Sequence, residues 1–138
     1  MKYKVAFVCV HNSCRSQMAE AWLKKLASDI FDVYSAGTEE YKEVKPLAAE
    51  VMEELGIDMS GHHPKLLSDI PEELDFLITM GCNVYCPFVP NRHSEDWGLD
   101  DPSGGPIEDY RVTRDLIESK VNEFIRRVKN NEIELTDL

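Results

Sequence analysis

The chain has 138 residues, of which 43% are apolar and 30% charged, as expected for one globular domain with a hydrophobic core. Its formal net charge of −11 argues against nucleic acid and anionic membrane surfaces as partners. No apolar run approaches the length of a membrane span and no signal peptide opens the chain, so we expect a cytoplasmic protein.

Apolar strands and amphipathic helices alternate in the first half of the chain. The pattern predicts a buried strand over residues 2–8, a helix over 14–28 and a short strand over 31–36. The next helix is predicted to begin at Pro46, because proline suits the first helical turn, and Gly56 suits its C-terminal cap.

Two further strands and the longest helix follow. The pattern predicts an apolar strand over residues 74–80, a short acidic strand near 94–97 and a helix over 106–128. The polar tail, 129–138, is expected to fray. Because strands that alternate with helices favour a parallel sheet, we predict an α/β fold with a four-stranded parallel sheet flanked by helices on both faces. A single domain is expected to span residues 1–138.

The junction between the first strand and the first helix carries the most functional information. Residues 9–16 read Cys-Val-His-Asn-Ser-Cys-Arg-Ser. The first amides of a helix lack intrahelical partners and carry partial positive charge, so such an end binds anions. The planar guanidinium of Arg15 can bond two anion oxygens at once. The expected oxyanion-binding residues are Val10, His11, Asn12, Ser13, Cys14, Arg15 and Ser16.

The same positive field favours the thiolate of Cys9, which makes this residue the candidate nucleophile. Ser16 can donate its hydroxyl to that sulfur, and Asn12 and Ser13 can hold the loop through side-chain hydrogen bonds. Cys14 is expected to be a packed thiol. A cysteine that ends a buried strand is commonly just a small apolar side chain, but an arginine and a serine at these spacings favour catalysis.

A second cysteine pair, Cys82 and Cys86, follows the third predicted strand. On a helix such residues lie about 5–6 Å apart, within reach of a disulfide. Pro87 disfavours helical geometry at Cys86, so the segment can open there. The residues alone leave a redox pair and two packed cysteines equally open. No metal is expected, because no metal-ligand spacing links the pair to any histidine.

The run Asp100-Asp101-Pro102-Ser103-Gly104 predicts a turn, in which an aspartate commonly bonds a nearby backbone amide. The chemistry of the cysteine suggests a second role. Thiolate attack on an oxyanion expels an oxygen leaving group, which needs a proton from a positioned acid. Asp101 is the first candidate for that acid, and Asp100 is the second.

With these residues identified, the chain resembles the thioredoxin-coupled arsenate reductases, which share the fold of the low-molecular-weight protein tyrosine phosphatases. The resemblance covers residues 3–128. Its motifs are Val-Cys-x5-Arg-Ser-Gln-Met-Ala-Glu-Ala at 8–21, Tyr-Ser-Ala-Gly at 34–37, the cysteine pair, and Trp-Gly-Leu-Asp-Asp-Pro-Ser-Gly at 97–104. The phosphatases typically carry aromatic residues after the Asp-Pro and lack the cysteine pair.

The resemblance implies a thiol relay that reduces arsenate, of which phosphate is an analogue. In that relay, Cys9 attacks the bound arsenate, and Asp101 assists the loss of oxygen. Cys82 then attacks Cys9 and releases arsenite. Cys86 next moves the disulfide to the Cys82–Cys86 pair, which thioredoxin reduces. Glutaredoxin or another dithiol protein is the alternative reductant. No cofactor is implied, and the implied role is arsenical detoxification.

Two features depart from the family pattern. Well-known reductases place six residues between the relay cysteines, whereas this chain has three. Some members bind potassium through an aspartate where this chain has Lys65, while Asn12, Glu20 and Ser35 match the other contacts. The ammonium of Lys65 would stand where the ion is stabilised, so we predict no potassium requirement.

Two other functions would use the same loop. A low-molecular-weight protein tyrosine phosphatase would form phosphocysteine at Cys9, with Asp101 as acid and then base, and would not use Cys82 or Cys86. A non-catalytic oxyanion-binding or redox-sensing module would merely oxidise or pack Cys9. The cysteine pair favours the reductase over the phosphatase, and an unreactive Cys9 thiol at neutral pH would favour the non-catalytic module.

Overall fold

The computed structural model describes residues 2–81 and 89–137, so Cys82 and Cys86 lie outside the described part of the chain. The described strands are β1 (Tyr3–Cys9), β2 (Phe31–Gly37), β3 (Leu74–Thr79) and β4 (Asn91–Asp96). The described helices are α1 (Arg15–Ala27), α2 (Pro46–Glu53), α3 (Ile107–Lys129) and a short 3-10 helix, η1 (Leu67–Asp69).

The strands pair in parallel in the order β2-β1-β3-β4, which confirms the predicted sheet. The fourth strand begins at Asn91, earlier than expected. Its pairing with β3 starts where Leu74 meets Asn91, and none of its side chains is fully buried. Backbone hydrogen bonds define this edge strand, so an apolar pattern does not mark where it begins.

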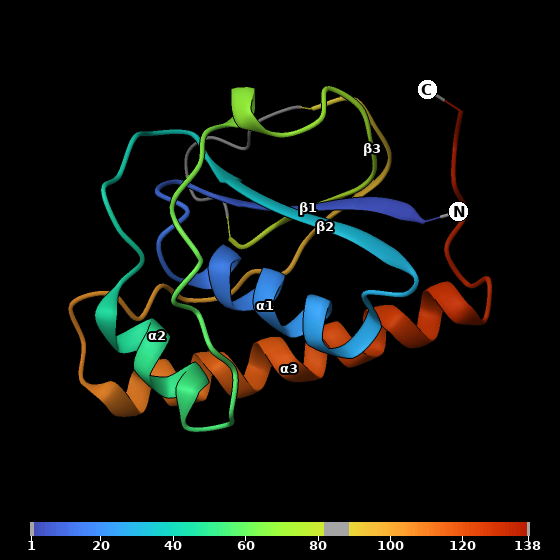
Figure 1. The fold of residues 1–138 in the computed structure, drawn as a ribbon. Coiled ribbons are helices and arrows are strands. Elements are labelled where there is room, and N and C mark those ends of the chain that lie inside the picture. The colour runs from blue at the N-terminus through green and yellow to red at the C-terminus, as the bar shows by residue number, and fades with distance from the viewer. Residues whose placement is uncertain (1, 82–88, 138) are drawn as a thin grey trace.

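The two faces of the sheet are covered differently. The helices α1, α2 and α3 lie together on one side (Figure 1). Along β1, Val5 and Phe7 belong to the main core on that side, whereas Ala6 and Val8 belong to a smaller core on the other face. The smaller core is closed by η1 and by Ile70. Helical structure therefore flanks both faces, but among the described residues the second face has just one 3-10 turn.

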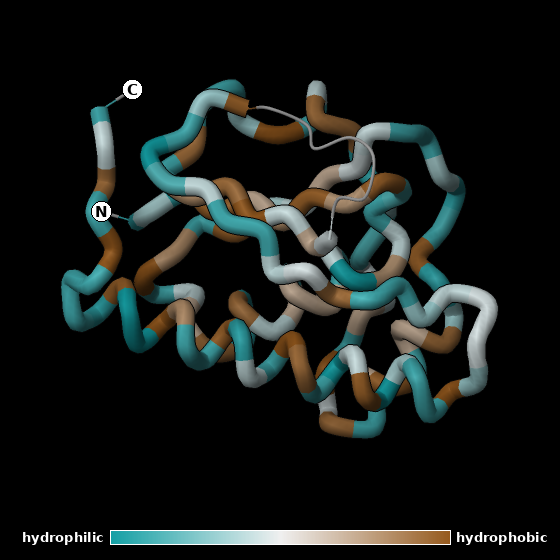
Figure 2. Tube along the Cα trace, turned by 180° about the vertical axis from the view of Figure 1, so that it is seen from behind, coloured by the Kyte–Doolittle hydropathy of each residue, from teal (hydrophilic) through white to brown (hydrophobic). Residues whose placement is uncertain are grey.

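Aromatic rings fill the main core between the sheet and α3. Phe76 on β3 meets Phe124 on α3 edge to face, with ring centroids 5.0 Å apart, and Phe31 on β2 stacks on Phe124 at 5.5 Å. Such rings bury large apolar areas, so they tie the longest helix to the sheet. Figure 2 shows the matching alternation of apolar and polar residues along α3. Leu26 on α1 and Leu55, which lies beyond the end of α2, are exposed.

The C-terminal tail, 129–138, contacts β4 and the main core in the described residues. Thr136 donates its backbone N–H and its hydroxyl to the Arg92 carbonyl, each at 3.0 Å, and Arg92 Nε donates to the Thr136 carbonyl at 3.2 Å. Ile133 and Leu135 pack against the main core. The tail thereby covers part of the open edge of β4, whose backbone groups need partners.

Parallel strands place their carboxyl ends at one edge of the sheet, where ligands of such folds bind. Cys9 ends β1 and Asp96 ends β4. The Asp96 carboxylate accepts hydrogen bonds from the Thr79 hydroxyl at 2.8 Å and from the Gly81 N–H at 2.7 Å. The chain that leaves β3 is therefore joined to the end of β4, on the edge where the loop after Cys9 begins.

Glu95 joins β4 to α3. Its carboxylate accepts hydrogen bonds from Arg127 Nη2 at 2.7 Å, from Trp97 Nε1 at 2.8 Å and from His93 Nε2 at 3.1 Å. Burial raises the pKa of Glu95, but these hydrogen bonds outweigh burial and lower that pKa to about 2. The ionised carboxylate thus anchors the start of the loop that leads to Asp101.

Replacing Glu95 by glutamine should destabilise the fold in a pH-dependent way. Because the folded-state pKa lies below the ordinary value of 4.5, the carboxylate stabilises the protein above that pH, and this stabilisation is lost as the pH falls toward 2. In urea unfolding at neutral pH, the wild type should be more stable than Glu95→Gln by roughly 2 kcal/mol, and this gap should close in acid.

The control for this prediction is Glu132→Gln, which breaks the exposed ion pair with Arg126. Exposed pairs contribute little to stability, so this variant should unfold like the wild type at every pH. A stability gap between the wild type and Glu95→Gln that did not shrink on acidification would contradict the assigned role of Glu95.

Candidate active site

The loop between β1 and α1 turns back on itself at Asn12. This residue has a φ of 54°, a left-handed conformation that asparagine tolerates better than most residues. Its side chain is fully buried. Nδ2 donates to Ser16 Oγ at 2.8 Å, and Oδ1 accepts from Gln17 Nε2 and from the Lys65 backbone N–H, each at 2.9 Å. The Asn12 side chain thus holds the curvature of the loop.

The sulfur of Cys9 lies 2.8 Å from Ser16 Oγ. Because Ser16 Oγ already accepts a hydrogen from the Asn12 amide, its own hydroxyl hydrogen is free to point at the sulfur. The Ser16 hydroxyl can therefore donate a hydrogen bond that would stabilise a thiolate at Cys9. Cys9 is partly exposed, whereas Ser16 is completely covered, so the sulfur can meet a ligand while its donor stays out of water.

Arg15 begins α1 and reaches across the carboxyl edge of the sheet. Its Nη1 donates to two carbonyls, those of Met80 and Leu99, each at 2.7 Å. Its Nη2 lies 3.9 Å from Asp101 Oδ2. Both Nη1 hydrogens are thus occupied. Arg15 can therefore form a bidentate pair with an anion only by donating from Nε and Nη2.

These side chains surround a cavity of about 350 Å³. Its lining residues are Cys9, Val10, His11, Ser13, Cys14, Arg15, Lys45, Asp101 and Ser103. The fold therefore brings the predicted nucleophile, the arginine and Asp101 together. Asp100 does not line the cavity. Asn12 and Ser16 have no exposed surface, so they support the loop from behind.

Two lining residues, Lys45 and Ser103, were missed by the sequence reasoning as site residues. Lys45 stands just before the proline that begins α2, and no motif marks it. Ser103 belongs to the predicted turn, where its N–H donates to Asp101 Oδ1 at 3.0 Å. That contact is the side-chain-to-backbone hydrogen bond expected of an aspartate in a turn.

Charge and burial set the protonation of two side chains in the cavity. Burial raises the pKa of Asp101, but hydrogen bonds from Ser103 and the nearby cations, Arg15 foremost, lower it below its ordinary value. Asp101 is therefore ionised at neutral pH. Burial, followed by the charge of Asp101, raises the pKa of Cys14 to about 12. Cys14 thus stays a thiol, packed in the loop.

A charged cluster lies around Glu20. The Lys65 ammonium is 3.5 Å from Glu20 Oε1, and Glu20 also accepts hydrogen bonds from Ser35 and from Lys24, the latter at 2.5 Å. Burial raises the pKa of Glu20, but the bonds from Lys24 and Ser35 outweigh burial and lower it. Two ammonium groups therefore balance this buried carboxylate.

Two histidines outside the cavity, His62 and His93, lie next to polar side chains. His62 Nδ1 lies 2.9 Å from Gln17 Oε1, and His93 pairs with Glu95 on β4. In the described part of the chain, no three His, Cys, Asp or Glu side chains gather so that they could hold a metal ion.

None of the helices that the structure describes is long and apolar enough to cross a membrane.

Gly37, the last residue of β2, lies directly against the anion-binding loop. A Cβ added to Gly37 would lie 2.6 Å from the Val10 carbonyl oxygen and 2.9 Å from the Asn12 nitrogen, closer than real contacts allow. The N–H groups of Thr38 and Glu39 both donate to the Val10 carbonyl, at 2.8 and 2.9 Å. Only glycine lets β2 approach the loop this closely.

We expect Gly37→Ala to displace the loop and to weaken phosphate binding by at least about tenfold, because the added methyl meets rigid backbone. Isothermal titration calorimetry with inorganic phosphate measures the change. Gly61→Ala is the matched control, since a Cβ there meets nothing within 4 Å. Equal phosphate affinity in Gly37→Ala and the control would show that this loop does not form the anion site.

Known proteins resemble this chain over nearly its whole length. The family model described as low molecular weight phosphotyrosine protein phosphatase matches residues 4–134. An arsenate reductase of Staphylococcus aureus is 41% identical over 130 residues, which cover 91% of this chain and 98% of the relative. Arsenate reductase 2 of Staphylococcus haemolyticus matches with the same identity and coverage.

Solved structures match as well. An arsenate reductase in the phosphate binding state has a TM-score of 0.82 and 39% identity, over 92% of this chain and 98% of that one. A thioredoxin-dependent arsenate reductase of Corynebacterium glutamicum has a TM-score of 0.77 and 31% identity, over 94% of this chain and 63% of that one. The parallel sheet, the Cys-x5-Arg loop at its carboxyl edge and a match over residues 4–134 together show that the chain belongs to the low molecular weight phosphotyrosine protein phosphatase family.

Proposed function

We propose that this chain is an arsenate reductase and that Cys9 is its nucleophile. The observation that carries the proposal is the cavity lined by the Cys9 sulfur, the Arg15 guanidinium and the Asp101 carboxylate. Relatives named arsenate reductase, which match at 41% identity over nearly their whole length, support arsenate as the substrate. The proposed role is arsenical detoxification in the cytoplasm, where thiols stay reduced.

In the first step, arsenate lies against the amides of residues 10–14 and the free hydrogens of Arg15. The Cys9 thiolate attacks arsenic, a sulfur–arsenic bond forms, and one oxygen leaves as water after protonation. Asp101 delivers a proton to that oxygen. Although Asp101 is ionised at rest, a doubly charged anion beside it disfavours its own charge, so substrate binding promotes its protonated form.

The second step moves two electrons from thiols to arsenic. The Cys82 thiolate attacks the Cys9 sulfur and a Cys9–Cys82 disulfide forms. The electron pair of the sulfur–arsenic bond stays with arsenic, which departs as arsenite. Cys86 then attacks Cys82, so the disulfide moves to the Cys82–Cys86 pair and the Cys9 thiolate is restored.

The roles of Cys82 and Cys86, which lie outside the described residues, rest on the sequence and on the contacts of their neighbour. Gly81 directly precedes Cys82 and lies against Arg15, since a Cβ added to Gly81 would be 3.2 Å from Arg15 Nη1. Gly81, the last described residue before Cys82, therefore lies beside a residue that lines the cavity. This position supports attack of Cys82 on Cys9.

Thioredoxin is the proposed reductant of the second disulfide. The Corynebacterium glutamicum relative is named thioredoxin-dependent, which supports this choice. A dithiol protein opens such a bond by thiol–disulfide exchange, with one of its thiolates attacking and the other resolving the mixed disulfide. Glutaredoxin uses related chemistry and is the alternative. Turnover with each purified reductant would distinguish them.

A phosphatase is the second candidate function, and the family model favours it. The cavity would bind phosphate as it binds arsenate, because the two anions share shape and charge. Water would release phosphate from a Cys9 phosphocysteine, with Asp101 acting as acid and then as base. That cycle has no step for Cys82 or Cys86, so the pair separates the two functions.

Replacing Cys82 by serine should lower thioredoxin-coupled arsenate turnover by at least about a hundredfold, because no thiol can then open the sulfur–arsenic adduct. Hydrolysis of an aryl phosphate should persist in the same variant. Unchanged arsenate turnover would rule out the relay, and loss of both activities would instead assign Cys82 a structural role.

A Cys86→Ser variant tests the order of the relay. It should release about one arsenite per enzyme and then slow sharply, because the Cys9–Cys82 disulfide cannot be passed on. Mass spectrometry of the digested product should find Cys9 and Cys82 joined. Full steady-state turnover in Cys86→Ser would contradict the proposed sequence of attacks.

Potassium chloride and sodium chloride at equal ionic strength should give arsenate turnover within about twofold of each other, because the Lys65 ammonium already helps to balance Glu20. Lys65→Gln removes that ammonium, so turnover in this variant should depend more strongly on which cation is added. A clear potassium stimulation of the wild type would contradict the prediction.

A further inference from the structure

Lys45 is a second cation in the cavity, outside the Cys-x5-Arg motif. It directly precedes α2 and lines the cavity together with Cys9, Arg15 and Asp101. Its backbone N–H donates to the Ser13 carbonyl at 2.7 Å. This bond ties the backbone of Lys45 to the anion-binding loop, so the two keep a fixed relation.

The side chain of Lys45 is held by Tyr41. Nζ donates to the Tyr41 hydroxyl at 2.6 Å and lies 4.8 Å from the centroid of the Tyr41 ring. The hydrogen bond raises the pKa of Lys45, so the ammonium stays charged at neutral pH. An ammonium carries three hydrogens, and Tyr41 is its one acceptor among the described residues. Two donors are therefore left for a ligand.

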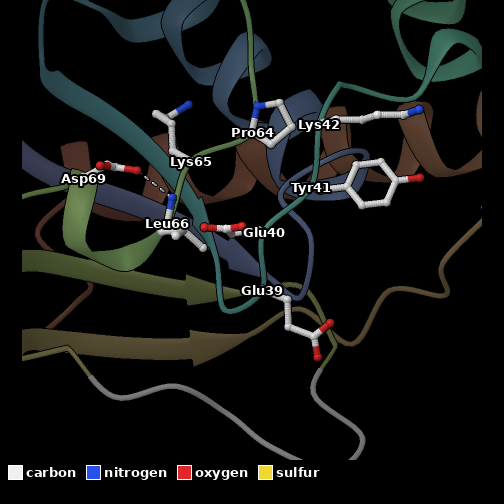
Figure 3. A pocket seen from close by; sticks show the side chains of 8 residues that line it. All are labelled: Glu39, Glu40, Tyr41, Lys42, Pro64, Lys65, Leu66 and Asp69. Atoms are coloured by element: carbon white, nitrogen blue, oxygen red, sulfur yellow. Dashed lines mark hydrogen bonds between the residues drawn. The ribbon is translucent and has the colours of Figure 1, made fainter.

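Tyr41 is itself braced by the loop. The His11 ring lies 4.8 Å from the Tyr41 ring at an interplanar angle of 31°, and His11 Nε2 pairs with Glu39 Oε2 at 3.2 Å. A neighbouring hollow of about 430 Å³ borders this segment, with Tyr41 and Lys42 on one side of it and Lys65 on the other (Figure 3). Lys42 thus lines that hollow, whereas Lys45 lines the active-site cavity.

The charges in the cavity would disfavour a doubly charged anion if Arg15 were the only cation there. The Asp101 carboxylate is negative, and the proposed attack requires a negative sulfur at Cys9. Arg15 offsets one of these two charges, and the protein as a whole carries −11. Without Lys45, a doubly charged anion would enter a cavity that is already negative. The charge of Lys45 acts on the cavity, because it helps to lower the pKa of Asp101.

We infer that Lys45, positioned by Tyr41, is a second contact for the oxyanion and makes the site prefer doubly charged over singly charged tetrahedral anions. The inference builds on the proposed function, since it concerns the same site, but binding alone tests it. Arg15 selects mainly by geometry, because its fork fits two oxygens of any tetrahedral oxyanion. An ammonium is a point charge, so its contribution scales with the charge of the ligand.

Sulfate and perchlorate are suitable probes, because both are tetrahedral oxyanions and they differ in charge. Calorimetric titration gives the Kd of each. Lys45→Gln should weaken sulfate binding about tenfold and perchlorate binding about threefold, so the preference for sulfate falls about threefold. Tyr41→Phe should lose part of the preference for sulfate, because it keeps the ring but removes the hydrogen bond to Lys45. Lys45→Arg keeps the positive charge and should retain most of that preference.

Lys42→Gln is the matched control, since it removes the same charge from the same segment but outside the cavity. Its Kd for either anion should stay within about twofold of the wild type. The inference is wrong if Lys45→Gln leaves the sulfate-to-perchlorate ratio unchanged, or if Lys42→Gln lowers that ratio equally. If Lys45→Gln does not fold, an unchanged ratio in Tyr41→Phe overturns the inference.

Binding and turnover can fail separately in this design. A protein that prefers sulfate through Lys45 but does not reduce arsenate would overturn the proposed function and support the inference. If the protein reduces arsenate but its sulfate-to-perchlorate ratio does not depend on Lys45, the proposed function is supported and the inference is overturned.

Discussion

The active site depends on one buried amide, the side chain of Asn12. The backbone of Asn12 takes a left-handed conformation at the centre of the loop. The side-chain amide hydrogen-bonds Ser16 at the start of α1 and the Lys65 backbone N–H far along the chain. A buried polar group that loses its partner costs about 1–3 kcal/mol. The same bonds leave the Ser16 hydroxyl free to donate to Cys9. The curvature of the loop and the surroundings of the Cys9 sulfur therefore depend on one side chain.

Arg15 extends this order to the rest of the carboxyl edge. Its Nη1 binds the Met80 and Leu99 carbonyls, one just after β3 and the other after β4. The guanidinium thus positions the loop that carries Asp101 while its remaining hydrogens stay available to an anion. Gly81 packs against the same guanidinium. One side chain thus contacts the chain after β3, the chain after β4 and the Asp101 carboxylate.

Several elements and much of the site were predictable because their signals are local. The Cys-x5-Arg-Ser run lies within one strand–helix junction, so the pairing of Cys9 with Ser16 follows from a short stretch of chain. Helix α3 was predictable because its apolar residues recur at helical spacing. The start of β4 and the docking of the tail were not, since they depend on backbone pairing with distant partners, which leaves no periodic signal.

The sequence by itself determined which side chains can do chemistry, namely a thiol, a guanidinium and a hydroxyl at fixed spacing, a second thiol pair and an aspartate in a turn. Tertiary structure decided which of these meet. It placed Asp101 and not Asp100 at the cavity, brought in Lys45, and set Gly37 and Lys65 behind the loop. These contacts join residues far apart in the chain, and packing of the sheet creates them, so no local pattern of residues could encode them.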